Sequence, residues 1–131
     1  MRAIMLVVLV MLLCGCAAAD RFFAVMLPSE AVGDAERGRV IFQSGINDAP
    51  SCQNCHALSP TAFAFAPDLL NVTERAATRV DGLNAHDYLM QSILEPTAYI
   101  VPGYRNMMYV AYADHLTEQD LADLIAFIES L

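Results

Sequence analysis

The six residues from Ser51 to His56, S-C-Q-N-C-H, limit what this chain can become more than any other segment. They place two thiols three positions apart and an imidazole directly after the second thiol. Residues at this spacing lie close together on one helical turn. The only other cysteines, Cys14 and Cys16, end an apolar N-terminal run. Without that run no disulfide network is available to stabilise a fold, so the Cys-Cys-His group must have another purpose.

Three kinds of chemistry use two cysteines at this spacing. A redox-active pair needs a strand–helix–strand context, which this sequence lacks. A zinc site needs a second ligand pair, and no other cysteine pair exists outside the N-terminal run. Attachment of a c-type haem fits best, because each thiol can bond one vinyl group of the same porphyrin while the histidine turns toward the iron. We therefore predict one haem c bound through Cys52 and Cys55 with His56 as an axial ligand; a buried cysteine pair without a function is the alternative.

The N-terminal segment has the pattern of a secretory signal, with Arg2 as its only charge before an apolar run and small residues. Leu13-Cys14-Gly15-Cys16 resembles the lipobox of bacterial lipoproteins, in which the chain is cut before a cysteine that carries a lipid. The resemblance implies lipidation of Cys16, because Gly15 suits the cleavage position. The alternative is an uncut anchor helix, since the run of about 17 residues is near the lower limit for a membrane span. Both place the domain outside the cytoplasm at a membrane, in the periplasm or on the outer face of the cytoplasmic membrane.

Length and charge restrict the function further. The length allows one folded domain, and we divide the chain into a lipoprotein signal at 1–15, a lipidated tether at 16–33 and a monohaem domain at 34–131. A net charge of −8, with seven basic residues that are all arginine, argues against a nucleic-acid partner. The hydrophobic content of 56% is slightly high for a soluble domain of this size. A discarded signal and a haem that forms part of the core account for that excess.

Helical periodicity dominates the rest of the chain. Thr117 is an N-cap, and apolar residues repeat after it at helical spacing to the end of the sequence. A middle helix is predicted over 84–95, ended by Pro96. The acidic residues between 114 and 129 occur without an arginine and are expected to form a solvated face. No strand pattern competes with these helices, so we predict an all-α fold.

From about residue 33 to the end, the chain resembles the class I cytochromes c. The segment 33–42 is similar to the first helix of that family, in which a glycine and an aromatic residue cross the last helix closely. Gly38 and Phe42 occupy those positions, and Phe127 matches the aromatic residue of the last helix. The resemblance implies the cytochrome c fold, a small helical domain wrapped around one covalently attached haem.

The family's second axial ligand is a methionine between the middle and last helices. Met107 and Met108 both lie there, and the spacing to the last helix favours Met108. The family's Met-Pro is Met-Tyr in this chain. Histidine ligation and an open sixth position are the alternatives, although His86 and His115 are expected to be surface histidines.

The resemblance implies contacts beyond the iron ligands as well. Ala66-Pro67-Asp68-Leu69 is similar to the family's Gly-Pro-x-Leu segment, in which the proline carbonyl accepts a hydrogen bond from Nδ1 of the proximal imidazole. This gives Pro67 the same expected role. The candidates to bond the haem propionates are Arg75, Arg79, Tyr88 and Tyr104.

Two protein ligands would leave the iron no position for a substrate, so we predict an electron carrier and not an enzyme. Membrane attachment favours a respiratory or photosynthetic chain, with a quinol-oxidising complex as donor and a terminal oxidase or reaction centre as acceptor. The acidic balance suits a basic or neutral partner. One alternative is an integral electron-transfer subunit of a larger membrane oxidoreductase. Another is a haem gas sensor or enzyme with an open sixth position.

Overall fold

The structure is a computed structural model that describes residues 31–60 and 65–131. The expected signal at 1–15, the expected lipidation site Cys16 and most of the tether at 16–33 lie outside the described residues. The described part consists of helices and irregular segments, so the prediction of an all-α domain is confirmed. Among the helices described, none is both long and apolar enough to cross a membrane.

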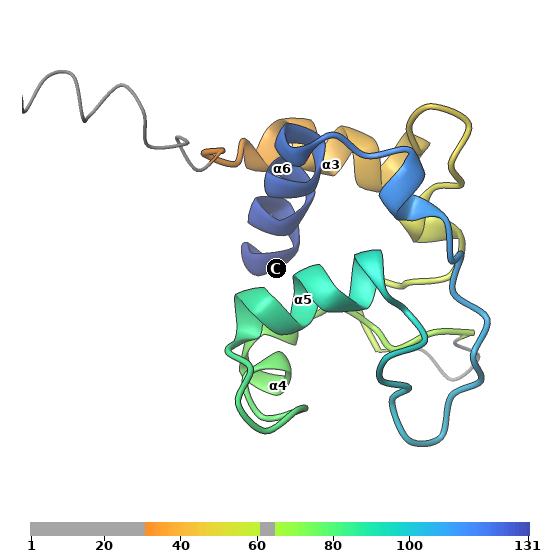
Figure 1. The fold of residues 1–131 in the computed structure, drawn as a ribbon, viewed down its shortest axis with the longest axis vertical. Coiled ribbons are helices and arrows are strands. Elements are labelled where there is room, and N and C mark those ends of the chain that lie inside the picture. The colour runs from red at the N-terminus through yellow and green to blue at the C-terminus, as the bar shows by residue number, and fades with distance from the viewer. Residues whose placement is uncertain (1–30, 61–64) are drawn as a thin grey trace, which may run out of the picture. The chain divides into compact units, whose positions relative to one another are not determined.

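Four α-helices and two 3-10 helices follow one another along the described ranges: α3 (Ala35–Ser44), η1 (Cys52–Asn54), α4 (Val72–Ala76), α5 (Ala85–Leu94), η2 (Tyr112–Asp114) and α6 (Glu118–Glu129). Figure 1 shows α3 and α6 crossing at one end of the domain, with α5 facing them and the short α4 beside α5. The predicted middle and last helices correspond to α5 and α6. The elements expected from the sequence do not include α4, η1 or η2.

Side-chain caps fix where the three long helices begin. Asp34, Asn84 and Thr117 accept hydrogen bonds from backbone N–H groups in the first turns of α3, α5 and α6. Thr117 also forms a capping box with Asp120. These caps satisfy N–H groups that have no partner within the helix. The helix starts are therefore determined by local sequence.

The crossing of α3 and α6 depends on a glycine. A Cβ atom at Gly38 would lie 1.9 Å from the carbonyl oxygen of Asp123 and 2.9 Å from Cβ of Phe127, so a side chain there would push the helices apart. Beside this contact the rings of Phe42 and Phe127 pack with their centroids 5.3 Å apart. The close glycine and aromatic contact between the first and last helices, which the family resemblance implies, is present.

Two acidic residues of α6 are buried at this crossing, so the expected solvated face is wrong for them. The Asp123 side chain is 0% exposed. Its carboxylate accepts hydrogen bonds from the Asp34 N–H, Gln119 Nε2 and Arg37 Nε, each at 2.7 Å. Asp120 lies 3.4 Å from Nη2 of Arg37. Partners on another helix compensate these charges, and the sequence of α6 alone does not reveal them.

We expect Gly38→Ala to destabilise the domain, because the added methyl group meets backbone atoms that cannot rotate away. Overpacking of this kind costs about 1–3 kcal/mol or more. Urea denaturation of the haem-loaded protein measures the change. Val40→Ala, on the exposed side of the same helix, is the control and should change stability little. Equal stability of Gly38→Ala and the wild type would show that the helices do not cross this closely.

We expect Asp123→Asn to destabilise the protein at neutral pH and to weaken its sensitivity to acid. Burial would raise the pKa of Asp123, but hydrogen bonds from Asp34, Gln119 and Arg37 together lower it below its usual value of 3.8. A carboxylate with a lowered folded-state pKa stabilises the fold above its unfolded pKa, and this contribution is lost as the pH falls through the folded value.

Unfolding midpoints measured between about pH 2 and pH 7 test this expectation, because that interval spans the titration of aspartate in both states. The exposed Asp81 provides the control variant Asp81→Asn, which should keep the wild-type profile. A wild-type acid profile in Asp123→Asn would contradict the assignment.

Candidate functional site

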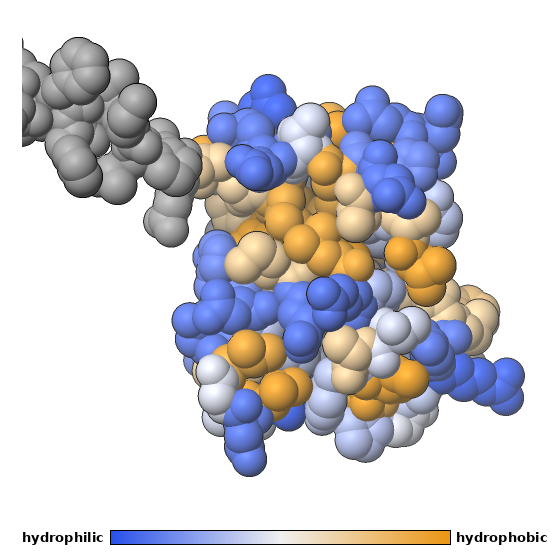
Figure 2. Space-filling model, in the orientation of Figure 1, coloured by the Kyte–Doolittle hydropathy of each residue, from blue (hydrophilic) through white to orange (hydrophobic). Residues whose placement is uncertain are grey.

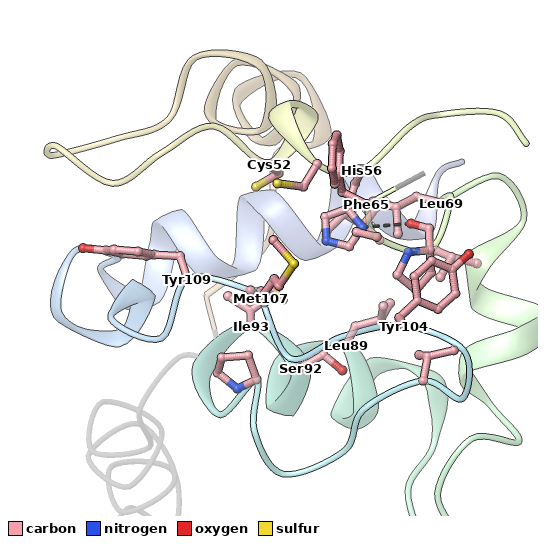
Figure 3. Close-up of a pocket in the computed structure, with 18 of the residues that line it drawn as sticks. Cys52, His56, Phe65, Leu69, Leu89, Ser92, Ile93, Tyr104, Met107 and Tyr109 are labelled. Atoms are coloured by element: carbon pink, nitrogen blue, oxygen red, sulfur yellow. Dashed lines mark hydrogen bonds between the residues drawn. The ribbon is translucent and has the colours of Figure 1, made fainter. Parts of the chain in front are cut away.

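An apolar cavity of about 610 Å³ lies within the helical domain. This volume is within the range of about 300–1,000 Å³ typical of cofactor and ligand pockets. Figure 2 shows apolar side chains gathered in a band across the middle of one face. Figure 3 shows Cys52 and His56 on one wall of the cavity and Leu89, Ser92 and Ile93 of α5 on the facing wall.

The two cysteines and the histidine project from one tight turn. The N–H groups of Cys55 and His56 both donate to the carbonyl oxygen of Cys52, at 3.1 and 2.9 Å. This hydrogen bonding continues η1 and brings all three side chains to the same wall. Both thiols are free. The turn thus presents two thiols and an imidazole to one cavity, as the sequence predicts.

The surroundings of Cys52 argue against redox-active cysteine chemistry. Burial raises the pKa of the Cys52 thiol to about 11, so this thiol is protonated at neutral pH. Reactive cysteines have pKa values lowered to about 3.5–7.5. Within residues 31–60 and 65–131, no group of three or more His, Cys, Asp or Glu side chains is arranged to hold a metal ion.

A backbone carbonyl fixes the orientation of His56. Its Nδ1 lies 2.9 Å from the carbonyl oxygen of Pro67. Because a carbonyl only accepts, Nδ1 carries the proton and Nε2 remains free as a ligand atom. Burial lowers the pKa of His56, and the hydrogen bond to Pro67 opposes that change only in part. The ring is therefore neutral near pH 7, the form that binds metals. The role of Pro67 toward a bound haem stays a prediction.

An arginine holds the segment that contains Pro67. Arg75 donates to the carbonyl oxygen of Leu70, to the carbonyl oxygen of Asp68 at 2.6 Å and to the Asp68 carboxylate at 3.3 Å. Arg75 is a candidate to bond the haem propionates, and these contacts engage three of the five N–H donors of its guanidinium group. The other candidates, Arg79, Tyr88 and Tyr104, also line the cavity.

Both candidate methionines line the same cavity. Met108 is half-buried and packs against the hydrophobic core. Met107 is 61% exposed, and Figure 3 shows its side chain within the cavity region. The choice of Met108 as the sixth ligand stays a prediction.

His115 has more partners than a simple surface histidine. Its Nδ1 lies 2.6 Å from the carbonyl oxygen of Asn47, and its Nε2 lies 2.9 Å from the hydroxyl of Tyr109. This group is not predicted from the sequence, in which its one signal is the tyrosine at the position of the family's proline. The exposed His86 matches the expected surface position, and its Nδ1 lies 3.0 Å from Glu129.

The residues around the cavity fit a c-type haem. Two thiols and a neutral imidazole share one wall, and a methionine thioether is available from another segment. These groups are the ones through which proteins hold such a haem covalently and ligate its iron. The predominantly apolar lining suits a porphyrin, because most of its surface is apolar.

Comparison with known families agrees with this fit. The family model described as Cytochrome c matches residues 35–131, which include every described helix. The match begins at the first residue of α3 and continues to Leu131. A comparison with curated proteins finds none that matches the chain.

Proposed function

Because the chain belongs to the cytochrome c family, we propose that it carries electrons through a haem iron ligated by His56 and Met108. As a member of that family it is a haem-based electron carrier and binds haem c covalently through the Cys52–Cys55 pair. Domains of this family are typically extracytoplasmic. We propose in addition the two axial ligands, a membrane anchor at Cys16 and redox complexes as partners.

The observation that carries the proposed ligation is the pairing of an oriented imidazole with a half-buried methionine around one cavity. His56 is neutral and directed by Pro67, so its Nε2 is available. Met108 packs against the core, whereas Met107 is 61% exposed. A ligand that must stay bound through many redox cycles is better supplied by the more buried of the two side chains, which is Met108.

A bound haem supplies a one-electron couple between ferric and ferrous iron. The protein's contribution is to keep both axial side chains in place in either state, so that little rearrangement accompanies electron transfer. Histidine with methionine ligation raises the reduction potential. The apolar lining acts in the same direction, because it disfavours the additional positive charge of the ferric site.

The surroundings of the cavity also suit contact with redox partners. Three apolar residues that line it are exposed to a substantial degree: Phe65, Ile100 and Met107. The net charge of −8 favours partners with a basic or neutral face. We propose a quinol-oxidising complex as donor and a terminal oxidase or reaction centre as acceptor. Lipidation at Cys16 would hold the domain at the same membrane as these complexes.

We expect Met108→Ala to abolish the methionine-to-ferric charge-transfer band, because the sulfur that produces it is removed. Met107→Ala is the matched control and should keep the band. Absorption spectra of the oxidised proteins and reduction potentials from redox titration measure both effects, and the potential should fall only in Met108→Ala. Loss of the band in Met107→Ala alone would assign the ligand to Met107. Strong carbon monoxide binding by the reduced wild type would indicate an open sixth position.

We expect Cys16→Ser to lose the covalent lipid, measured by incorporation of a labelled fatty acid, because the lipid attachment atom is removed. The unaltered chain should be extracted only by detergent and should co-purify with a redox complex after crosslinking. Cys14→Ser is the control and should keep the label. Absence of the label from the unaltered chain, with its N-terminal run retained, would favour the uncut anchor helix. Co-purification that persists without crosslinking would favour an integral subunit of a larger oxidoreductase.

A further inference from the structure

The segment 105–110, which contains both candidate methionines, is held by very few hydrogen bonds. It contains only bends, turns and irregular backbone. Among the described residues, no backbone–backbone hydrogen bond of good geometry involves this segment, and the turn at Val110 leads directly into η2. The one side-chain hydrogen bond found for it there joins the Tyr109 hydroxyl to Nε2 of His115, at 2.9 Å. The position of the methionine segment therefore depends strongly on that contact and on packing.

The partners of His115 determine the direction of these hydrogen bonds. Nδ1 of His115 lies 2.6 Å from the carbonyl oxygen of Asn47, which can only accept, so Nδ1 carries the proton. In the tautomer with its proton on Nδ1 alone, Nε2 is an acceptor and the Tyr109 hydroxyl donates to it. The side-chain amide of Asn47 donates in turn to the carbonyl oxygen of His115 at 2.9 Å. We call this arrangement the Tyr109–His115–Asn47 chain.

The hydrogen bonds of the Tyr109–His115–Asn47 chain extend to the loop that leads to the cysteine pair. Asn47 lies within the turn closed by the hydrogen bond from the Ala49 N–H to the Ile46 carbonyl oxygen, at 2.8 Å. That turn connects α3 to Cys52. The methionine side of the cavity is thereby tied to the cysteine side across a long separation in sequence.

An aromatic contact supports the same connection. The rings of Tyr109 and Tyr112 meet edge to face with their centroids 5.1 Å apart. The Tyr112 hydroxyl donates to the carbonyl oxygen of Pro50 at 2.9 Å, two residues before Cys52. Tyr109 is thus fixed by its ring as well as by its hydroxyl, and it immediately follows Met108 in the chain.

We propose that Tyr109 is a positioning residue, whose hydroxyl holds the methionine segment closed through His115. The inference rests on the proposed ligation by Met108. A proline after the methionine would restrict the backbone covalently. In this protein a tyrosine follows the methionine. The Tyr109–His115–Asn47 chain restricts the backbone of the methionine segment through residues that lie outside that segment.

Tyr109→Phe tests the proposal, because it removes the hydroxyl and keeps the ring against Tyr112. The probe is imidazole, which binds ferric haem only in molecules whose methionine has left the iron. Its apparent affinity is therefore proportional to the fraction of open segment. Loss of one hydrogen bond should increase that affinity about three- to tenfold. The methionine-to-ferric band should weaken and the reduction potential should fall.

The second variant, His115→Ala, should change the same three readouts in the same direction. The double variant of Tyr109 and His115 should bind imidazole at most slightly more tightly than either single variant does. The reason is that both substitutions remove the same shared hydrogen bond. His86→Ala is the control, because it removes an exposed histidine that is not part of the Tyr109–His115–Asn47 chain. It should match the wild type.

The outcomes separate this proposal from the proposed ligation. If the wild type shows the band, Met108→Ala loses it and Tyr109→Phe keeps the wild-type imidazole affinity and potential, the positioning role of Tyr109 is overturned. Lower thermal stability of Tyr109→Phe with unchanged affinity and potential overturns it equally. If the wild type lacks the band, the methionine ligation itself is wrong, and the proposal for Tyr109 falls with it.

Discussion

The close crossing of α3 and α6 is the constraint on which the rest of the domain depends. Gly38 removes the side chain that would separate the two backbones. At the same point the buried carboxylate of Asp123 joins the start of α3, through the Asp34 N–H, to the guanidinium of Arg37. A buried carboxylate is stable only where hydrogen bonds and an opposite charge compensate the loss of water. The crossing therefore fixes one register between the two helices. This register determines where α3 ends and the loop toward Cys52 begins.

The elements that could be predicted are those whose signals are local. The caps and the apolar repeat of α6, and the span of α5 before Pro96, are contained within a few residues. The short α4 has five residues and too few positions for a periodic pattern. The expected solvated face failed at Asp120 and Asp123, because Arg37, which neutralises them, is more than 80 residues away in sequence. Charge along one helix does not reveal such a partner.

The residues of the site also divide into those with a local signal in the sequence and those without one. The Cys52–Cys55–His56 motif could be interpreted from its spacing alone, since one turn carries all three side chains. The contact between His56 and Pro67 followed from a family pattern, because no local rule joins residues 11 positions apart. The Tyr109–His115–Asn47 chain could not be found this way. It joins residues 68 positions apart through a ring nitrogen and a backbone carbonyl, and neither atom leaves a trace in periodicity or composition.

The two sides of the cavity are consequently held in different ways. On the side of His56, the backbone turn of η1, the Pro67 carbonyl and the contacts of Arg75 together fix the ring. On the methionine side, one side-chain hydrogen bond and aromatic packing replace regular backbone structure. Local opening requires least free energy where backbone hydrogen bonds are few. With the proposed ligation by Met108, the methionine segment should thus be the first to respond when the protein is perturbed, while the wall that carries Cys52, Cys55 and His56 remains in place.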